Sequence, residues 1–459
     1  MIQRMNSTAT ISGLSSRVPD GTLPLASLYF LSSASMFFWA YMPRQMSALG
    51  WTGAQIGLFF AIKTISQAIA TPAWAKMADN PEKSRPELLK WQYLIAAVAI
   101  GLLSVATSWT FGVVLAVLIG ATVRCAPPLM DTMTLGTVGL NRFGRVRAFG
   151  TAGFGIVALG FGLLGIIFDH GILATAAPWL MFGLVAVAVP IIGMLPGARA
   201  TADDGEPLRE TERKSTGASP NIGSLLMSPV VLLVFPVAAL FAATYVPYDL
   251  FLVQLAEERS FGAWLPGLAI FVGVIGELLG FLSFRSLVKR ISPHLIASIV
   301  VAITGVRWIL TGATTNPLFF VALQILHGLT FAAFFMAMLE IMTRHWGDDL
   351  GATPQGLLYL LVFTAGGGLG NLVSGILYDL GSAAALFQQA GTASFILLPG
   401  LVLALWFAHR IADRDADRWT QGTAGRFVRP PQPQVGVPLE AARQRYARIS
   451  TSSSTFSRT

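Results

Sequence analysis

Three consecutive apolar stretches each carry an ionisable residue near the middle: Glu277 in 265–284, Arg307 in 296–312 and His327 in 318–343. Stretches of about 17 to 25 apolar residues are long enough to cross a lipid bilayer as helices. A charge within the hydrocarbon costs about 2.5 kcal/mol or more, so such a residue generally faces a partner or a water-filled cavity. An acid, an arginine and a histidine on successive spans therefore predict a polar site inside a membrane protein.

The composition favours a membrane protein over a soluble one. Of the 459 residues, 54% are hydrophobic and 12% are charged, and the mean hydropathy is +0.64. Soluble domains carry about 25% charged residues, and one core cannot hide this much apolar surface. The net charge of +8 does not indicate nucleic-acid binding, because the basic residues fall in short segments between apolar stretches. Residues 1–23 lack the features of a secretory signal, and the single cysteine, Cys125, excludes an intramolecular disulfide.

Apolar stretches along the chain predict an all-α polytopic membrane protein with twelve transmembrane helices. Their approximate limits are 24–48, 53–75, 88–107, 110–138, 147–168, 174–195, 229–254, 264–285, 294–313, 317–343, 354–378 and 384–409. Loops on the side of the N-terminus hold Lys76, Lys83, Arg85, Lys90, Arg142, Arg145, Arg199, Arg209, Arg213, Lys214, Arg285, Lys289, Arg290 and Arg344. Loops on the opposite side hold only Arg44 and Arg259. Because basic loops stay in the cytoplasm, we expect a multi-pass protein of the cytoplasmic (inner) membrane with both termini in the cytoplasm.

The spans divide into two halves. We expect a cytoplasmic tail over 1–23, a six-helix bundle over 24–195, a cytoplasmic linker over 196–228, a second six-helix bundle over 229–409, and a basic, disordered cytoplasmic tail over 410–459. The linker is polar and the tail is rich in arginine and proline, which indicates chain without a packed core. Two halves of six spans are typical of duplicated transporters, whose site lies near the bilayer midplane between the halves.

Four short motifs lie at or beside particular spans: Ala75-Lys76-Met77-Ala78-Asp79 after the second, Gly144-Arg145-Val146-Arg147-Ala148-Phe149-Gly150 at the fifth, Arg307-Trp308 in the ninth and Leu326-His327-Gly328-Leu329-Thr330-Phe331 in the tenth. They resemble signatures of the major facilitator superfamily, and within it of the lactose permease and phenylpropionate permease-like proton symporters. The resemblance extends over about residues 25–410. It implies the two-bundle major facilitator fold and the transport of a sugar, a nucleoside or an aromatic acid.

The resemblance also implies roles for single residues. It places Asp131, Arg147, Phe154, Tyr248 and Asp249 in the substrate site, Glu277, Arg307 and His327 in the substrate and proton site, and Asp79 in a gating loop. The sequence departs from the family's pattern at Thr330, where the family has a proton-carrying glutamate, and at Leu252, Gln324 and Phe363, where the family has an aspartate and two lysines. These departures leave open which residue carries the proton, and they leave Asp249 without the partner that the family would supply.

Glu277 is suited to proton transfer on physical grounds. Desolvation raises the pKa of a carboxylic acid and a nearby arginine lowers it, so a conformational change that exchanges one environment for the other would bind and release a proton. The alternative is a permanent structural pair between Glu277 and Arg307. His327 has two roles open to it: a proton relay, since histidine titrates near neutral pH, or a neutral hydrogen-bonding residue.

The ionisable residues within the first half are Lys63, Arg124, Asp131 and Arg147, and those of the second half are Asp249, Glu277, Arg307 and Glu340. Arg124 and Asp131 are seven residues apart, which predicts a shared helix face. A cationic half that faces an acidic half suits an amphoteric or anionic substrate, so we assign Lys63 and Arg124 to the substrate site. The alternatives are pairing across the cavity and, for Lys63 and Arg147, snorkelling or pairing with loop acids. Glu340 lies toward the cytoplasm and is assigned to a gate or loop contact.

These features together indicate a secondary active transporter, with proton-coupled symport by alternating access as the first hypothesis. The sequence has no phosphate-binding Gly-x-x-x-x-Gly-Lys-Ser/Thr motif and no His/Cys cluster with metal spacing. We therefore expect no enzyme activity, no cofactor or metal, and the proton gradient as the energy source. The expected partners are a small-molecule substrate and the lipid bilayer, and the expected state is a monomer. An efflux antiporter of drugs or metabolites, and a non-transporting receptor, remain the alternatives.

Overall fold

The computed structural model describes residues 21–80, 82–195, 222–346 and 353–422, and these residues form helices without any strand. The N-terminal bundle consists of α1 (Thr22–Phe37), η1 (Phe38–Ala40), α2 (Met42–Ala48), α3 (Gly53–Ala78), α4 (Arg85–Leu103), α5 (Trp109–Ala121), η2 (Val123–Cys125), α6 (Ala126–Val138), α7 (Leu140–Leu164) and α8 (His170–Gly193). The C-terminal bundle consists of α9 (Ile222–Leu226), η3 (Val230–Val234), α10 (Phe235–Ala243), α11 (Val246–Glu258), α12 (Trp264–Leu287), α13 (Pro293–Ala313), α14 (Pro317–Leu323), α15 (Leu326–Trp346), α16 (Thr353–Leu358), η5 (Tyr359–Thr364), α17 (Ala365–Leu380) and α18 (Ala383–Gly422).

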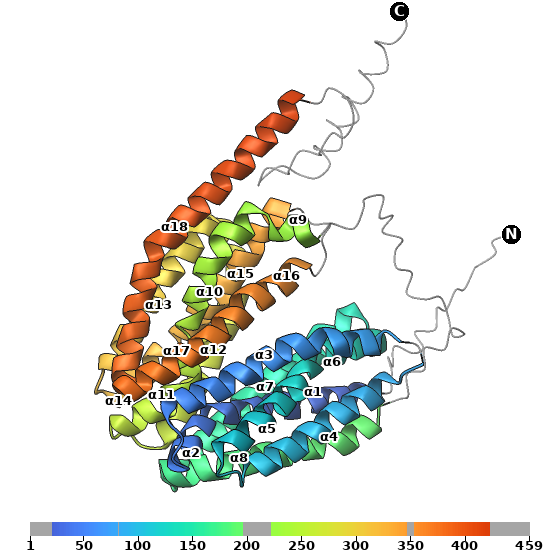
Figure 1. Ribbon diagram of the computed structural model, residues 1–459, viewed down its shortest axis with the longest axis vertical. Coiled ribbons are helices and arrows are strands. Elements are labelled where there is room, and N and C mark those ends of the chain that lie inside the picture. The colour runs from blue at the N-terminus through green and yellow to red at the C-terminus, as the bar shows by residue number, and fades with distance from the viewer. Residues whose placement is uncertain (1–20, 81, 196–221, 347–352, 423–459) are drawn as a thin grey trace, which may run out of the picture.

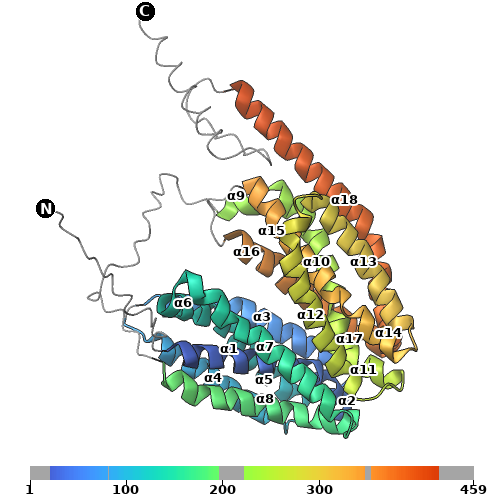
Figure 2. The same cartoon turned by 180° about the vertical axis from the view of Figure 1, so that it is seen from behind.

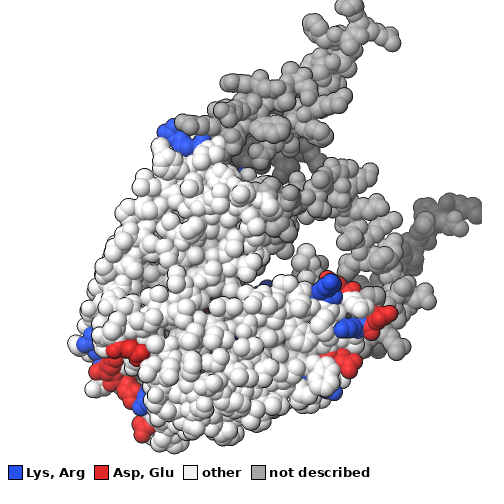
Figure 3. Space-filling view, in the orientation of Figure 1, with Lys and Arg blue, Asp and Glu red and all other residues white. Residues whose placement is uncertain are grey.

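Twelve segments of the described chain are long and apolar enough to span a membrane, which confirms the predicted fold class. Charged side chains on the face shown in Figure 3 gather at the ends of the bundles, and the broad surface between them carries almost none. Such a surface suits the hydrocarbon of a bilayer, because exposed apolar side chains replace charges there. The limits agree with the predicted spans to within a few residues at most ends.

Two predicted boundaries differ from the structure. The last helix continues to Gly422, so residues 410–422 are helical and not part of a disordered tail. The sequence explains this, since no glycine or proline interrupts the chain between Gly400 and Gly422. The short helix α9 also lies within the predicted linker. The predicted tail over 1–23, apart from its last three residues, and the predicted segments 196–221 and 423–459 lie outside the described residues.

The first, fourth, seventh and tenth spans are interrupted near their middles. Prolines follow closely in three of them, at Pro43, Pro127 and Pro247, and a proline removes a backbone donor from the helix. The tenth span breaks without a proline. There the Gln324 side chain donates to the Phe320 carbonyl (2.8 Å), and the Gln324 backbone N–H turns to the Val321 carbonyl. These breaks place polar side chains and backbone at mid-span.

The two bundles meet at one end and diverge toward the other, as the two opposite views show (Figures 1 and 2). At the closed end α3 packs against α17, and α7 packs against α12. Glycines allow these approaches: a Cβ on Gly375 would lie 3.0 Å from the Gly57 Cα, and one on Gly162 would lie 3.0 Å from the Leu268 nitrogen. The surface is hollowed between the bundles at the open end, where α6 ends and α16 begins (Figure 3). The structure therefore has a central cavity with access from one side.

Candidate functional site

The centre of the C-terminal bundle is built around Arg307 on α13, which is fully buried. Its guanidinium donates to the Gln324 Oε1 (2.7 Å), shares a hydrogen bond with the His327 Nδ1 (3.1 Å) and reaches the Thr330 Oγ1 (3.4 Å). It also lies 4.0 Å from the centre of the Trp308 ring. Within the described chain no acid forms an ion pair with it. A buried arginine is thus held by neutral acceptors and an aromatic face.

His327 is neutral in this arrangement. Arginine does not lose its proton in proteins and only donates, so the His327 Nδ1 must be the acceptor, and the hydrogen of the neutral ring is on Nε2. The ring is stacked between Tyr248 (centroids 4.7 Å apart, 24° between planes) and Phe331 (5.7 Å, 8°). Of the two roles open from the sequence, hydrogen bonding is the one present in this conformation, and the relay role stays a prediction.

Glu277, on α12, is half-buried. The described residues give its carboxylate no hydrogen bond and no ion pair, so the structural pair with Arg307 is not formed here. Glu277 lies within electrostatic range of Tyr248 and of Tyr359 in η5. Tyr359 in turn is within range of Asp131 and Arg147 from the other bundle. Glu277 is therefore an acid without an ion-pair partner among the described residues, and its role in proton transfer stays a prediction.

Asp131 and Arg147 form a pair within the N-terminal bundle. The Tyr29 hydroxyl donates to one Asp131 oxygen (2.5 Å), and the Arg147 Nη1 lies 3.4 Å from the other. More than half of the Arg147 side chain is exposed, so the guanidinium borders the open space. The pairing of Arg147 with Asp131 replaces the expected alternative of loop acids. Phe154 packs edge-to-face on Phe37, with centroids 6.0 Å apart.

Lys63 and Arg124 lie deeper in the same bundle. Lys63 on α3 is 6% exposed, and its ammonium lies 3.8 Å from the centre of the Trp39 ring, so it does not snorkel. Arg124 in η2 donates to the Gln67 Oε1 (3.3 Å) and to the Met36 sulfur (2.9 Å). Gln67 and Met36 were not predicted as partners of Arg124, because neither residue is charged or belongs to a recognised motif.

The predicted shared face of Arg124 and Asp131 is wrong. The helix is broken at residues 122–125, so Arg124 lies in η2 while Asp131 lies on α6. The two side chains have different partners as a result. Seven-residue spacing places residues on one face only where the helix between them is continuous.

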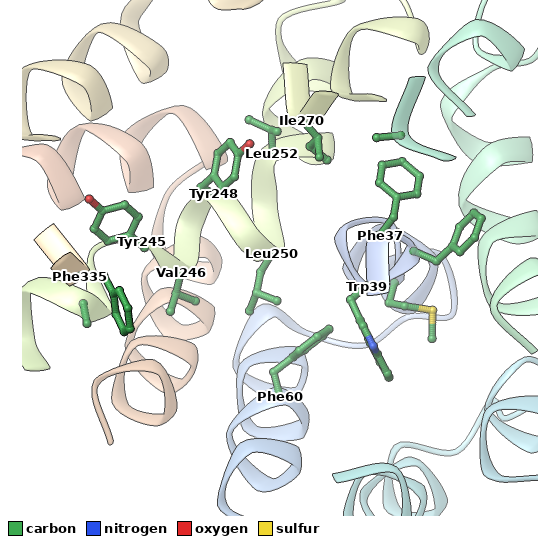
Figure 4. Close-up of a cluster of buried hydrophobic side chains, with 14 of the residues drawn as sticks. Phe37, Trp39, Phe60, Tyr245, Val246, Tyr248, Leu250, Leu252, Ile270 and Phe335 are labelled. Carbon is green, nitrogen blue, oxygen red and sulfur yellow. The ribbon is translucent and has the colours of Figure 1, made fainter. Parts of the chain in front are cut away.

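Asp249, in the first turn of α11, is exposed to the cavity. It lies within electrostatic range of Lys63, Arg124 and Arg307, yet none of the described cations forms an ion pair with it. Figure 4 shows buried apolar side chains of the two bundles meeting in this region, with Phe60 beside Leu250 and Trp39 nearby. Asp249 of the C-terminal bundle therefore lies in the same region as Lys63 and Arg124 of the N-terminal bundle.

The two residues assigned to gating, Asp79 and Glu340, interact within their own helices. Asp79 caps the end of α3 and is exposed. Glu340 accepts a hydrogen bond from Arg344 one turn along α15 (2.8 Å), an exposed i,i+4 pair. Neither side chain forms a contact between the bundles among the residues described, so their gating roles stay predictions.

The closed end carries two polar contacts between the bundles that the sequence did not reveal. Arg44 in α2 makes a bidentate pair with Glu257 at the end of α11, in which the Nη2–Oε1 distance is 2.8 Å. The hydrogen bonds that Arg44 donates to the Glu257 carboxylate raise the pKa of Arg44 above its usual value. The Asp379 carboxylate accepts from the Gly53 and Ala54 N–H groups (2.5 and 2.8 Å) at the start of α3. A carboxylate at a helix N-terminus is stabilised by the unpaired N–H groups. We call these two contacts the latch.

No three His, Cys, Asp or Glu side chains of the described segments gather closely enough to hold a metal ion.

Comparisons with known proteins agree with the fold. Residues 22–389 match the model of the MFS_1 like family. One similar crystal structure is that of the nucleoside transporter NupG, at 18% identity and a TM-score of 0.71, covering 84% of this chain and 99% of that one. Another is a bacterial homolog of the human lysosomal transporter Spinster in an inward-facing, unoccupied conformation, at 15% identity and a TM-score of 0.62, covering 86% and 96%. At these identities the likeness concerns the fold.

Proposed function

The chain belongs to the MFS_1 like family, and on that premise we propose that this transporter moves a small organic solute by proton-coupled symport. The observation that carries the proposal is the central cavity itself. Ionisable side chains from both bundles line it, one end is open, and the other is closed by the latch and by glycine contacts. Rocking of the two bundles about this cavity would expose the same residues to each side in turn.

We place the open end in the cytoplasm. The loops predicted to be cytoplasmic, such as that between α3 and α4, lie at the open end (Figure 1), whereas Arg44 lies at the closed end. Basic residues favour the cytoplasmic side, so the cavity of this conformation faces inward. The same argument supports a multi-pass protein of the inner membrane with both termini in the cytoplasm.

Glu277 is our candidate for the proton carrier. It has no partner among the described residues in this conformation, and the Arg307–His327 group lies in the same bundle. Movement of the bundles would change which charges face the carboxylate, and a change of neighbours shifts the affinity for a proton. Thr330, where the family's glutamate would stand, is bonded to the Leu326 carbonyl (2.9 Å) and cannot carry the proton itself.

The test is proton uptake into proteoliposomes during addition of solutes, with sugars, nucleosides and ring-bearing carboxylic acids on the panel. Nucleosides belong there because NupG is a nucleoside transporter. We expect one solute to draw protons with it in the wild-type protein. Glu277→Gln is expected to keep solute exchange and to lose the proton movement, since an amide cannot release a proton.

Glu87→Gln is the matched control, because Glu87 is an exposed acid in the first turn of α4 and has no role assigned in the cavity or in a gate. It should retain coupled uptake. If solute moves without protons in the wild-type protein, coupling is excluded and the chain is a uniporter or exchanger. Equal proton movement in Glu277→Gln would remove Glu277 from the coupling role.

A further inference from the structure

Lys63 and Arg124 form a pair of cations inside the N-terminal bundle. Lys63 lies within electrostatic range of Arg124, and burial makes both charges costly. The Lys63 ammonium lies over two rings, 3.8 Å from the centre of Trp39 and 4.3 Å from that of Phe60. The Arg124 guanidinium has one amide oxygen and one thioether sulfur as partners. Aromatic faces, an amide and a sulfur lower the cost of a cation but do not neutralise it.

The nearby acid does not neutralise them either. Asp249 belongs to the opposite bundle and is in electrostatic range of Lys63, Arg124 and Arg307, but in the described structure it makes no ion pair with any of them. Three basic side chains thus lie within electrostatic range of a single acid. A buried charge generally has a paired counter-charge. The centre of the cavity therefore retains an excess of positive charge that a ligand can satisfy.

We propose that Lys63 and Arg124 bind the carboxylate of the transported solute, and that this solute is a ring-bearing organic acid. The proposal rests on the transport function proposed above and names the substrate class of the same site. Arginine offers a carboxylate two parallel donors, and lysine adds a compact charge. Such contacts would be formed only while the solute is bound.

The rest of the cavity wall suits a flat ring. Phe331 lies parallel to His327, and Phe363 contacts both Phe331 and Tyr359, with centroids 5.6 and 5.8 Å apart. Tyr359 is 47% exposed and lies across the cavity from Asp131 and Arg147. Binding sites for organic solutes combine such aromatic walls with a few convergent polar groups. The proposal places the carboxylate at Lys63 and Arg124 and the ring of the solute against these aromatic side chains of the C-terminal bundle.

The competing explanation is mutual neutralisation. In another conformation of the cycle, Lys63 could pair directly with Asp249 across the cavity, and the cations would then serve closure instead of binding. The two explanations predict different results for the double variant Lys63→Met/Asp249→Asn. If the charges only neutralise one another, removing both restores function. If Lys63 binds the solute's carboxylate, the double variant still lacks it.

The experiment measures binding of acids and their amides to the purified full-length protein in nanodiscs. The probes are benzoate, cyclohexanecarboxylate and indole-3-acetate, each paired with its primary amide, and uridine as an uncharged solute. We expect an acid to bind about ten- to a hundredfold more tightly than its amide, the range for a lost hydrogen bond to a charged group. Lys63→Met and Arg124→Gln should each weaken that acid by a similar factor and leave its amide unchanged. Lys76→Met, at the exposed end of α3, is the control and should change neither.

Several results would overturn the proposal. They are equal binding of acid and amide in the wild-type protein, binding of uridine but of no acid, binding of no probe at all, or recovery of acid uptake in Lys63→Met/Asp249→Asn. The acid-to-amide ratio of the wild-type protein needs no variant, so it decides the matter even if a substitution prevents folding. If the wild-type protein carries out counterflow of uridine or of an amide but binds no acid more tightly, the transport function is supported and the carboxylate site is rejected.

Discussion

At the scale of single residues, the buried charge of Arg307 depends on Gln324. Gln324 is fully buried, and its side chain makes two hydrogen bonds. Its oxygen accepts from Arg307, and its amide nitrogen donates to the Phe320 carbonyl at the helix break. Gln92 has the same residue type and the same burial, but both of its polar atoms lack a partner in the described structure. The two glutamines form a natural comparison.

Replacing each glutamine by methionine, which has a similar volume, should have opposite effects. Gln324→Met leaves a buried guanidinium short of an acceptor, so we expect the free energy of unfolding to fall by about 2–3 kcal/mol. Gln92→Met removes two unpaired polar atoms and should be neutral or stabilising. Thermal unfolding of the purified variants in one detergent measures the difference. Equal losses in both would show that the contact with Arg307 contributes nothing specific.

At the scale of the helices, the glycines between α3 and α17 allow the closed end to form. A Cβ on Gly375 would lie 3.0 Å from the Gly53 carbonyl carbon and from the Gly57 Cα, and backbone cannot move aside as a side chain can. Gly368, two turns earlier on α17, has no atom within 4 Å of such a Cβ. Gly368 and Gly375 are therefore a matched pair, because an added Cβ would meet open space at Gly368 and backbone atoms at Gly375.

We therefore expect Gly375→Ala to separate the closed end and to slow uptake, whereas Gly368→Ala should leave uptake unchanged. Alanine favours helix over glycine by up to about 1 kcal/mol, so a loss in Gly375→Ala cannot be attributed to helix propensity. Initial uptake rates at matched protein levels are the measurement. Wild-type rates in Gly375→Ala would mean that α3 and α17 need not approach this closely during the cycle.

At the scale of the whole molecule, the spans and the two-bundle fold could be predicted because both depend on local patterns. Apolar length predicts a span, and the motifs around Arg145 and His327 predict the family, which the match over residues 22–389 confirms. Asp131 and Arg147, which the resemblance places in one substrate site, also come together in the structure. Local sequence patterns are therefore sufficient to predict the spans, the fold and the family.

The contacts between the bundles could not be predicted in the same way. Glu257 lies 213 residues from Arg44, and Asp379 lies 326 residues from Gly53, so no spacing rule connects them. The shared face of Arg124 and Asp131 failed because a helix break intervened. The partners of Lys63 were missed because aromatic rings in a chain with 30 phenylalanines give no signal of their own. Each of these features depends on tertiary packing, which local sequence patterns do not reveal.

The central claim, that two bundles rock about the cavity, is tested most directly by measuring distances at both ends in one preparation. Spin labels at Ala48 and Ala385 report the closed end, and labels at Gly136 and Gly356 report the open end, with Cys125→Ser removing the native thiol. The raised pKa of Arg44 keeps its guanidinium charged at all physiological pH values, so substitution, not alkaline pH, must be used to break the latch.

Arg44→Met in the lipid-embedded protein should lengthen the distance at the closed end and shorten the one at the open end. A partly exposed pair is worth up to about 1 kcal/mol, or roughly a fivefold change in the ratio of the two states. Arg344→Met, which breaks an ion pair within one helix, should change neither distance. Alternating access predicts that the two distances shift in opposite directions. Distances that stay fixed at both ends, or that lengthen together, would contradict it.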